Sequence, residues 1–202
     1  SKQVTGFTAS QILALRTDQI VALETEDLVG FTSTQIAAFS TAQINALSTT
    51  QVAALKSAQV ASLSTDQVAV LGTDDIVALN TSQIASLTSA QLRTLATDRL
   101  QALATEDVAA LGTVQLAALS TAQIVALESA DFAALKSANL SAFSTDQLRA
   151  LETSDIVAMS TAQIVALTAT QFAALEGRQI AALETADFAA LKTTQAAALT
   201  AA

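Results

Sequence analysis

The chain of 202 residues contains no cysteine, histidine, proline, tryptophan or tyrosine. Without cysteine or histidine it has no disulfide, no thiol nucleophile, no zinc-finger site, no histidine-ligated haem and no Ser-His-Asp triad. Its 9 Lys and Arg residues are outnumbered by 18 Asp and Glu residues, and this net charge of −9 argues against a nucleic-acid surface. Apolar runs stay far below the roughly 18 residues that span a bilayer, so we expect no membrane insertion.

What the chain does contain is one eight-residue unit, repeated without insertion from Thr8 to Leu199. We call this unit an octad and number its positions 1 to 8 from Thr8. The stretch holds 24 octads (192/8), and the consensus is x-[ST]-x-[QD]-[IVLF]-x-A-L. Residues 1–7 fit the last seven positions of an earlier octad, and residues 200–202 begin a further one. We therefore expect residues 1–202 to form a single continuous repeat array.

The two ends of the chain indicate that this array is a segment of a longer one. Both ends interrupt an octad, and neither has the polar capping repeat that usually closes a free-standing solenoid. The first residue is Ser1, and neither an initiator Met nor a signal peptide is present. We therefore expect the numbering to begin inside a processed or excised product.

The octad favours a short helix. In one continuous α-helix, equivalent residues would rotate by about 80° per octad and would form no apolar stripe. Positions 5 and 8 would face opposite sides of a strand, whereas on a helix they share a face. One buried Ile and one buried Leu cannot offset the entropy of ordering eight residues, so the octads must stack. The sequence predicts an all-α solenoid of short helices of at most two turns, one per octad, with two octads forming each helix-turn-helix layer.

The octad also contains residues that predict where each helix starts. In Leu119–Ile124, Ser120 and Gln123 have the spacing of a capping box, with Leu119 and Ile124 as a hydrophobic staple. Position 1 is a residue able to cap in 13 octads. In the other 11, such as the one beginning Glu184-Thr185, we expect the position 2 residue to cap instead. The helix start is therefore open to within one residue. The handedness and the number of octads per superhelical turn are also open.

Two polar columns are candidate binding surfaces. The Ser/Thr column at position 2 could bind ice or a crystalline surface, and the Gln/Asp column at position 4 could bind cations or polysaccharide. Helix capping and first-turn hydrogen bonds to backbone amides explain both columns more simply, and we favour that interpretation.

No residue stands out as catalytic, cofactor-binding or metal-binding, and we expect no enzyme and no cofactor. The acidic pairs Glu26-Asp27, Asp74-Asp75 and Glu106-Asp107 lack the spacing of a calcium loop and are interpreted as solvated helix starts. Phe132, Phe172 and Phe188 replace Ile or Leu at position 5 and are expected in the core.

The octads, such as Ser160-Thr161-Ala162-Gln163-Ile164-Val165-Ala166-Leu167, resemble those in octapeptide-repeat regions of very large secreted or surface adhesin-like proteins of Gram-negative bacteria. The resemblance covers the whole chain. It implies an extracellular or cell-surface location and a fibrous or spacer role, and it transfers no binding residue.

The sequence as a whole favours a structural, non-enzymatic extracellular repeat protein that forms a fibre, stalk or filament. Its expected partners are further copies or neighbouring repeats of the same protein, because exposed solenoid ends invite assembly. The alternative is a binding module for ice, glycan or protein that uses the repeated Thr and Gln columns.

Overall fold

The computed structural model describes residues 4–199, which contain helices and no strand. A 3-10 helix, η1, covers Val4–Gly6, and one short α-helix follows in each of the 24 octads. The predicted all-α solenoid of short helices, one per octad, is therefore confirmed. Of the partial repeats predicted at residues 1–7 and 200–202, residues 1–3 and 200–202 lie outside the described residues.

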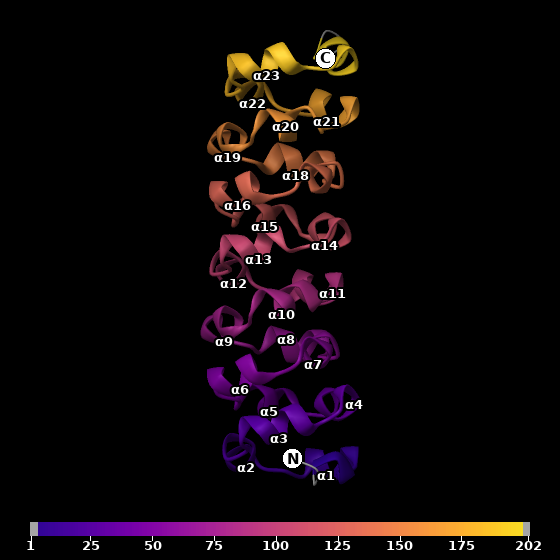
Figure 1. Cartoon of the computed structure of the whole chain (residues 1–202), viewed down its shortest axis with the longest axis vertical. Helices are drawn as coiled ribbons and strands as arrows, with labels where there is room; N and C mark the ends of the chain where they lie inside the picture. Colours follow the sequence, from indigo (N-terminus) through magenta and orange to yellow (C-terminus); the bar gives the residue numbers. More distant parts are fainter. Residues whose placement is uncertain (1–3, 200–202) are drawn as a thin grey trace. The chain divides into compact units, whose positions relative to one another are not determined.

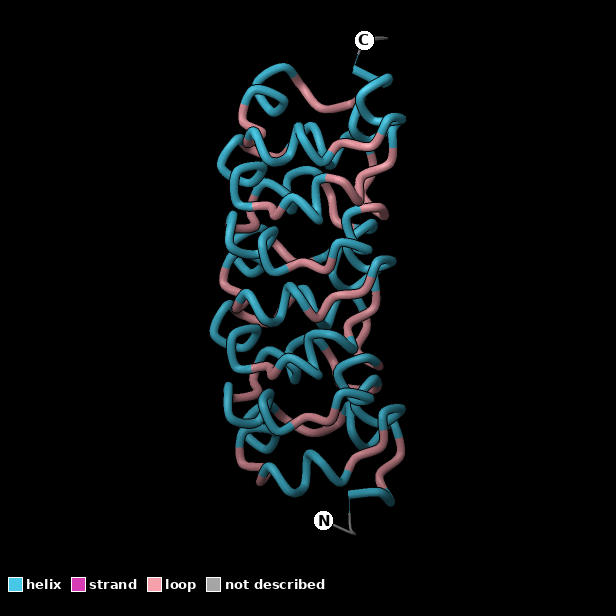
Figure 2. Tube along the Cα trace, turned by 45° about the horizontal axis from the view of Figure 1, so that its top comes forward, coloured by secondary structure: helices cyan, strands magenta, loops and turns pink. Residues whose placement is uncertain are grey.

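The chain divides into two compact units, Ser1–Ala110 and Leu111–Ala202. Both repeat the same pattern of short helices and short connections (Figures 1 and 2). The first unit contains η1 and α1 (Ala9–Leu13), α2 (Thr17–Val21), α3 (Thr25–Gly30), α4 (Ser33–Ala37), α5 (Thr41–Asn45), α6 (Thr49–Ala54), α7 (Ser57–Ala61), α8 (Thr65–Ala69), α9 (Thr73–Ala78), α10 (Thr81–Ser86), α11 (Ser89–Thr94), α12 (Thr97–Gln101) and α13 (Thr105–Ala109). The second contains α14 (Thr113–Ala118), α15 (Thr121–Val125), α16 (Ser129–Ala134), α17 (Ser137–Leu140), α18 (Thr145–Ala150), α19 (Thr153–Ala158), α20 (Thr161–Ile164), α21 (Ala169–Ala173), α22 (Gly177–Ala181), α23 (Thr185–Ala190) and α24 (Thr193–Leu199). That residues 1–202 form one continuous array stays a prediction.

Every α-helix begins at position 2, and the N-caps from Thr8 to Glu184 are all position 1 residues, even where the side chain cannot cap. Ser120 accepts the Gln123 N–H on its hydroxyl at 3.2 Å, as the sequence predicts. The expected shift of the cap to position 2 in the octad of Glu184 and Thr185 is wrong. Glu184 is the N-cap there, and its own N–H donates to Asp187 Oδ2 at 3.0 Å. The position 4 side chain therefore holds the start of the helix when position 1 contributes only backbone.

The chain changes direction between helices without glycine. Leu119, at position 8, has φ −63° and ψ 141°, and Ser120, at position 1, has φ −70° and ψ 161°. Two extended residues in sequence re-aim the backbone, and no described residue has a positive φ. The turns therefore need no left-handed residue, which fits a chain with only 5 glycines.

Neighbouring turns of the solenoid are three octads apart, so the expected two-octad layers are wrong. In the first unit α4 contacts α7 and α7 contacts α10, and in the second unit α16 contacts α19. In Figure 1, α6, α9 and α12 lie on one side of the first unit, and α16, α19 and α22 lie on one side of the second. Each helix is too short to fold back on the next one, so its apolar face is covered by the following turn instead.

The core consists of the large residues at positions 5 and 8, which face the inside of every turn. Phe132 and Phe172 are completely buried, as predicted. Phe188 is 43% exposed, and its predicted place in the core is wrong. It lies in the last turn of the described chain, where no later octad covers the apolar face.

Candidate functional site

The polar side chain at position 4 is the feature that most distinguishes this solenoid from a simple hydrophobic stack. Its first role is local. Gln43 Oε1 accepts the backbone N–H of Ser40 at 2.8 Å, and the Gln43 N–H donates to Ser40 Oγ at 3.2 Å. This is the predicted capping box, which satisfies amides that a helix start leaves without partners.

The second role of position 4 is to join one turn to the previous one. Gln43 Nε2 donates to the backbone carbonyls of Ile12 and Leu15, each at 2.7 Å. These carbonyls belong to positions 5 and 8 of the octad four places earlier. Similar bonds form what we call the glutamine ladder, in which Gln83 reaches positions 6 and 8 instead. Its donors are Gln35, Gln43, Gln51, Gln59, Gln67, Gln83, Gln91, Gln147, Gln163, Gln171, Gln179 and Gln195.

The ladder glutamines are buried, and Gln179 is 0% exposed. A glutamine amide has one acceptor oxygen and two donor hydrogens, so one side chain caps its own helix and binds the turn before it. Each such hydrogen bond contributes roughly 0.5–1.5 kcal/mol net when formed. The position 4 column is therefore an internal support of the stack.

Sequence reasoning missed this second role, although a signal was present. A capping box accepts Glu as readily as Gln, yet position 4 contains Gln in 16 octads and Glu in none. A glutamate there would bury a carboxylate against backbone carbonyls and donate nothing. The absence of Glu fits the need for a donor wherever a position 4 side chain is long enough to reach the carbonyls of an earlier octad; the shorter Asp occurs at this position and bonds differently.

Aspartate at position 4 connects the turns by a different bond. Asp155 is 5% exposed; its Oδ2 accepts the Glu152 N–H at 2.8 Å, and its Oδ1 accepts the Ser129 hydroxyl at 2.7 Å. Thr161 donates in the same way to Asp187 Oδ1 at 2.7 Å. In these octads the earlier turn donates and the later turn accepts, because a carboxylate has acceptors only.

Two other residues at position 4 keep the direction of the glutamine bonds. Arg99 Nη1 donates to the Ala69 carbonyl at 2.6 Å, and Asn139 Nδ2 donates to the Leu111 carbonyl at 3.1 Å. Both side chains supply a donor to an earlier octad. In these two octads the connection to an earlier octad is therefore kept although the residue type changes.

The two columns that were predicted as possible binding surfaces, at positions 4 and 2, differ in their exposure. The ladder glutamines have no surface to offer a cation or a polysaccharide, since their amides are buried and bonded within the protein. The hydroxyl column is partly outward: Thr41, Thr49 and Thr65 at position 2 are exposed. Only the hydroxyls remain as a candidate outer surface.

The three acidic pairs lie in the first turns of their helices, as predicted, but Asp107 is 8% exposed, so its interpretation as a solvated residue is wrong. Glu26 and Asp27 are in the first turn of α3, and Asp74 and Asp75 are in the first turn of α9. Asp75 Oδ2 accepts the Gly72 N–H at 2.9 Å. Residues 4–199 contain no group of three or more acidic side chains arranged to hold a metal ion.

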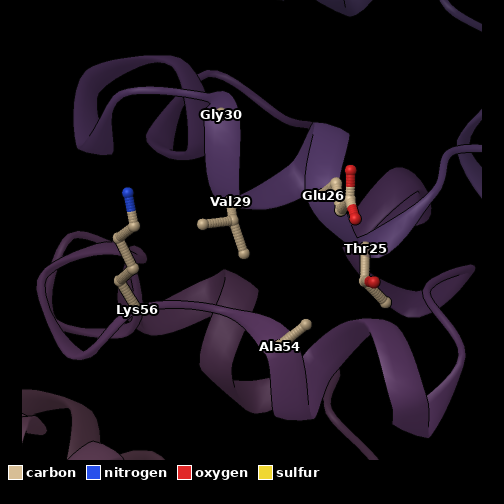
Figure 3. A pocket seen from close by; sticks show the side chains of 6 residues that line it. All are labelled: Thr25, Glu26, Val29, Gly30, Ala54 and Lys56. Carbon is tan, nitrogen blue, oxygen red and sulfur yellow. The ribbon is translucent and has the colours of Figure 1, made fainter. Parts of the chain in front are cut away.

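The first unit has an open surface groove of about 450 Å³. Thr25, Glu26, Val29 and Gly30 of α3 form one side, and Ala54 and Lys56 from the end of α6 and the start of α7 form the other. Figure 3 shows the Glu26 carboxylate and the Lys56 ammonium on opposite sides, with Val29 between them. The groove is shallow, and it brings no acid and base together on one reacting point.

A family model for the ALTTAQ repeat matches residues 20–57, 52–81, 68–105, 100–127, 124–154 and 148–185. These overlapping matches run through most of the chain and confirm the predicted tandem repeat. No curated protein matches the chain.

Proposed function

Since the chain belongs to the ALTTAQ repeat family, we propose that it is a structural, non-enzymatic repeat protein that works as a stretch of extracellular fibre or stalk. We further propose that the chain is part of a very large, adhesin-like secreted or surface protein, in which the octads act as a spacer. Among residues 4–199, none of the helices has the length and hydrophobicity that a membrane-spanning segment needs.

The observation that carries the proposal is the glutamine ladder. A binding protein or an enzyme would present such polar groups to a ligand. Here the position 4 side chains instead form hydrogen bonds that join successive turns. Gln59 Nε2, for example, donates to the carbonyls of Leu28 and Phe31, both at 2.8 Å, in a site that is 1% exposed. A chain whose recurrent polar residue resists separation of its turns suits a load-bearing spacer.

Single-molecule stretching tests the mechanical part of the proposal. A chain held at both termini should extend in many small steps, because each turn is held by its own hydrogen bonds to the turn before it. Electron microscopy of the purified material should show thin extended particles. Globular particles of one fixed size would contradict a fibre or stalk.

Surface labelling tests the location. Antibodies against the octads should label intact cells of the organism that makes the protein. Labelling that appears only after the cells are permeabilised would contradict an extracellular role, whatever the mechanical result.

The binding alternative retains one observation in its favour, the exposed hydroxyls at position 2. Thermal hysteresis and glycan-array assays would detect it. Replacing Thr41, Thr49 and Thr65 with Ala should abolish that binding and leave the circular dichroism spectrum unchanged. Absence of ice or glycan binding by the unchanged chain removes those two ligands from consideration.

A further inference from the structure

The asparagines of the chain differ in sequence context and in exposure. Residues 80–82 (Asn-Thr-Ser) and 139–141 (Asn-Leu-Ser) have the N-x-[ST] spacing of an acceptor for an N-linked sugar, whereas residues 45–47 (Asn-Ala-Leu) do not. Asn80 and Asn45 are exposed, and Asn139 is 6% exposed. The sequence contains no other asparagine, so Asn80 alone combines the motif with exposure.

The amide of Asn80 uses only its oxygen within the protein. Asn80 is the N-cap of α10, and its Oδ1 accepts the Gln83 N–H at 3.1 Å. Its Nδ2 makes no hydrogen bond among the described residues. A bond from Nδ2 to a sugar replaces one amide hydrogen and leaves Oδ1 in place. The helix cap and an attached sugar are therefore compatible at this residue.

The rest of the motif is accessible as well. The backbone of Asn80 is extended, with φ −81° and ψ 164°, and the exposed Ser82 hydroxyl makes no hydrogen bond among the described residues. In the turns that pack on either side of α10, the position 1 residues are Lys56 and Ala104, and both are exposed. The motif therefore lies at an outer connection of the first unit.

The second motif has the opposite surroundings. Asn139 Nδ2 donates to the Leu111 carbonyl at 3.1 Å, and the neighbouring Leu140 is completely buried. A sugar on this nitrogen would place many hydroxyl groups in the core without water to bind them. The folded chain therefore has room for a sugar at Asn80 and none at Asn139.

We propose that Asn80 carries an N-linked sugar. In the transfer, Nδ2 forms a bond to the anomeric carbon of a sugar that is activated through phosphate on a nucleotide or a lipid. The bond from that carbon to the phosphate oxygen breaks, and the phosphate leaves with the electron pair. A base of the transferase takes the proton that Nδ2 loses. The inference rests on the proposed extracellular location, because the motif marks surface segments of secreted proteins.

Mass spectrometry of the protein purified from the organism that makes it is the first test. Trypsin separates the three asparagines into residues 17–56, 57–93 and 137–149. Only residues 57–93 should carry a sugar, and a peptide N-glycosidase in heavy-oxygen water should convert Asn80 into labelled aspartate. A single hexose indicates a nucleotide-linked donor, and one fixed oligosaccharide indicates a lipid-linked donor.

Variants of the whole chain, produced in the same organism, separate the motif from the exposed amide. Ser82→Ala breaks the motif, keeps Asn80 and its capping bond, and should lose the mass shift of residues 57–93. Ser82→Thr is the matched control, and it should retain the mass shift. Circular dichroism verifies that each variant is folded.

A further variant adds a motif at an equivalent position. Ser48 is an exposed N-cap, and Thr49 and Thr50 follow it. Asparagine caps a helix as well as serine does. Ser48→Asn should therefore add a sugar to residues 17–56, which carry none in the unchanged chain.

Residues 57–93 without a sugar overturn the proposal, and so does a Ser82→Ala variant that keeps the mass shift. A sugar on residues 137–149 of the folded protein would also overturn it, since burial would then not select between the two motifs. Stretching and surface labelling are measured separately, so an unmodified Asn80 leaves the fibre or stalk function to be decided by those experiments.

Discussion

At the scale of single residues, the protein depends on how many hydrogen-bonding groups one side chain offers. Glutamine at position 4 supplies an acceptor for its own helix and donors for the turn before it. Aspartate supplies two acceptors, so a hydroxyl of the earlier turn must become the donor. The residue type at one position thus sets the direction of the bond between turns.

Gln59→Glu tests the donor role. The variant keeps the oxygen that accepts the Lys56 N–H, loses the bonds to the Leu28 and Phe31 carbonyls, and buries a carboxylate beside them. We expect a loss of at least about 2 kcal/mol in unfolding free energy, measured by urea denaturation. Gln11→Glu, the same change at an exposed position 4, should cost less than about 0.5 kcal/mol. Equal losses in the two variants would mean that position 4 acts only as a cap.

Ser129→Ala tests the reversed bond. It removes the hydroxyl that donates to Asp155 Oδ1 and leaves a buried carboxylate with one bond fewer. The expected cost is roughly 1.5–3 kcal/mol, the range for hydrogen bonds to charged groups. Ser137→Ala is the matched control, because Ser137 has the same position in the next octad and its hydroxyl makes no hydrogen bond among the described residues. Thermal melts of both variants provide the measurement. Equal losses of stability would show that the hydrogen bond of the Ser129 hydroxyl is not responsible.

At the scale of the helix, the octad specifies a start more firmly than an end. All position 1 residues from Thr8 to Glu184 are N-caps, although they range from serine to lysine. The helices end at positions 5 to 8, and a bond from the position 8 N–H to the position 5 carbonyl closes most of them, as Leu127 does to Ile124 at 3.2 Å. Start and closure together limit each helix to about one turn.

Removal of one N-cap side chain should therefore lower the free energy of unfolding only where that side chain accepts a hydrogen bond from the helix start. Ser120→Ala loses the acceptor for the Gln123 N–H and should destabilise its unit by about 1 kcal/mol. Glu152→Ala, at a position 1 whose side chain makes no capping bond, should change the free energy of unfolding by less than about 0.5 kcal/mol. Urea titrations of the two variants provide the comparison. A similar loss in both would show that helix propensity at position 1, rather than the hydroxyl, is responsible.

At the scale of the whole molecule, stability comes from repetition of one contact within each unit. Helices three octads apart pack together, and position 4 side chains reach the octad four places earlier. Within this pattern of contacts, one octad can take the place of another. Stability then depends on keeping the eight-residue spacing between equivalent positions.

Two deletions test the register. Removal of residues 80–87 takes out one octad, so each later side chain finds an equivalent octad four places earlier. The helical circular dichroism signal per residue should stay within about a tenth of that of the unchanged chain, because each repeat contacts only neighbouring repeats. Removal of residues 80–83 shifts position 4 away from its carbonyls and should cost far more helix and cooperativity. Equal tolerance of both deletions would contradict a fixed octad register.

The sequence by itself determined the period, the short helix in each octad, the capping box at Ser120 and Gln123, and the burial of positions 5 and 8. These follow from interactions within eight residues, such as i, i+3 facing and first-turn hydrogen bonds, which local composition records. It did not determine the three-octad turn, the common helix start at Glu184, the buried amide of Gln59 or the exposure of Phe188. Those depend on the small backbone rotations at positions 8 and 1, which add up over several octads and decide which turn lies on which. Only the tertiary structure brings a position 4 side chain to carbonyls 28 and 31 residues earlier.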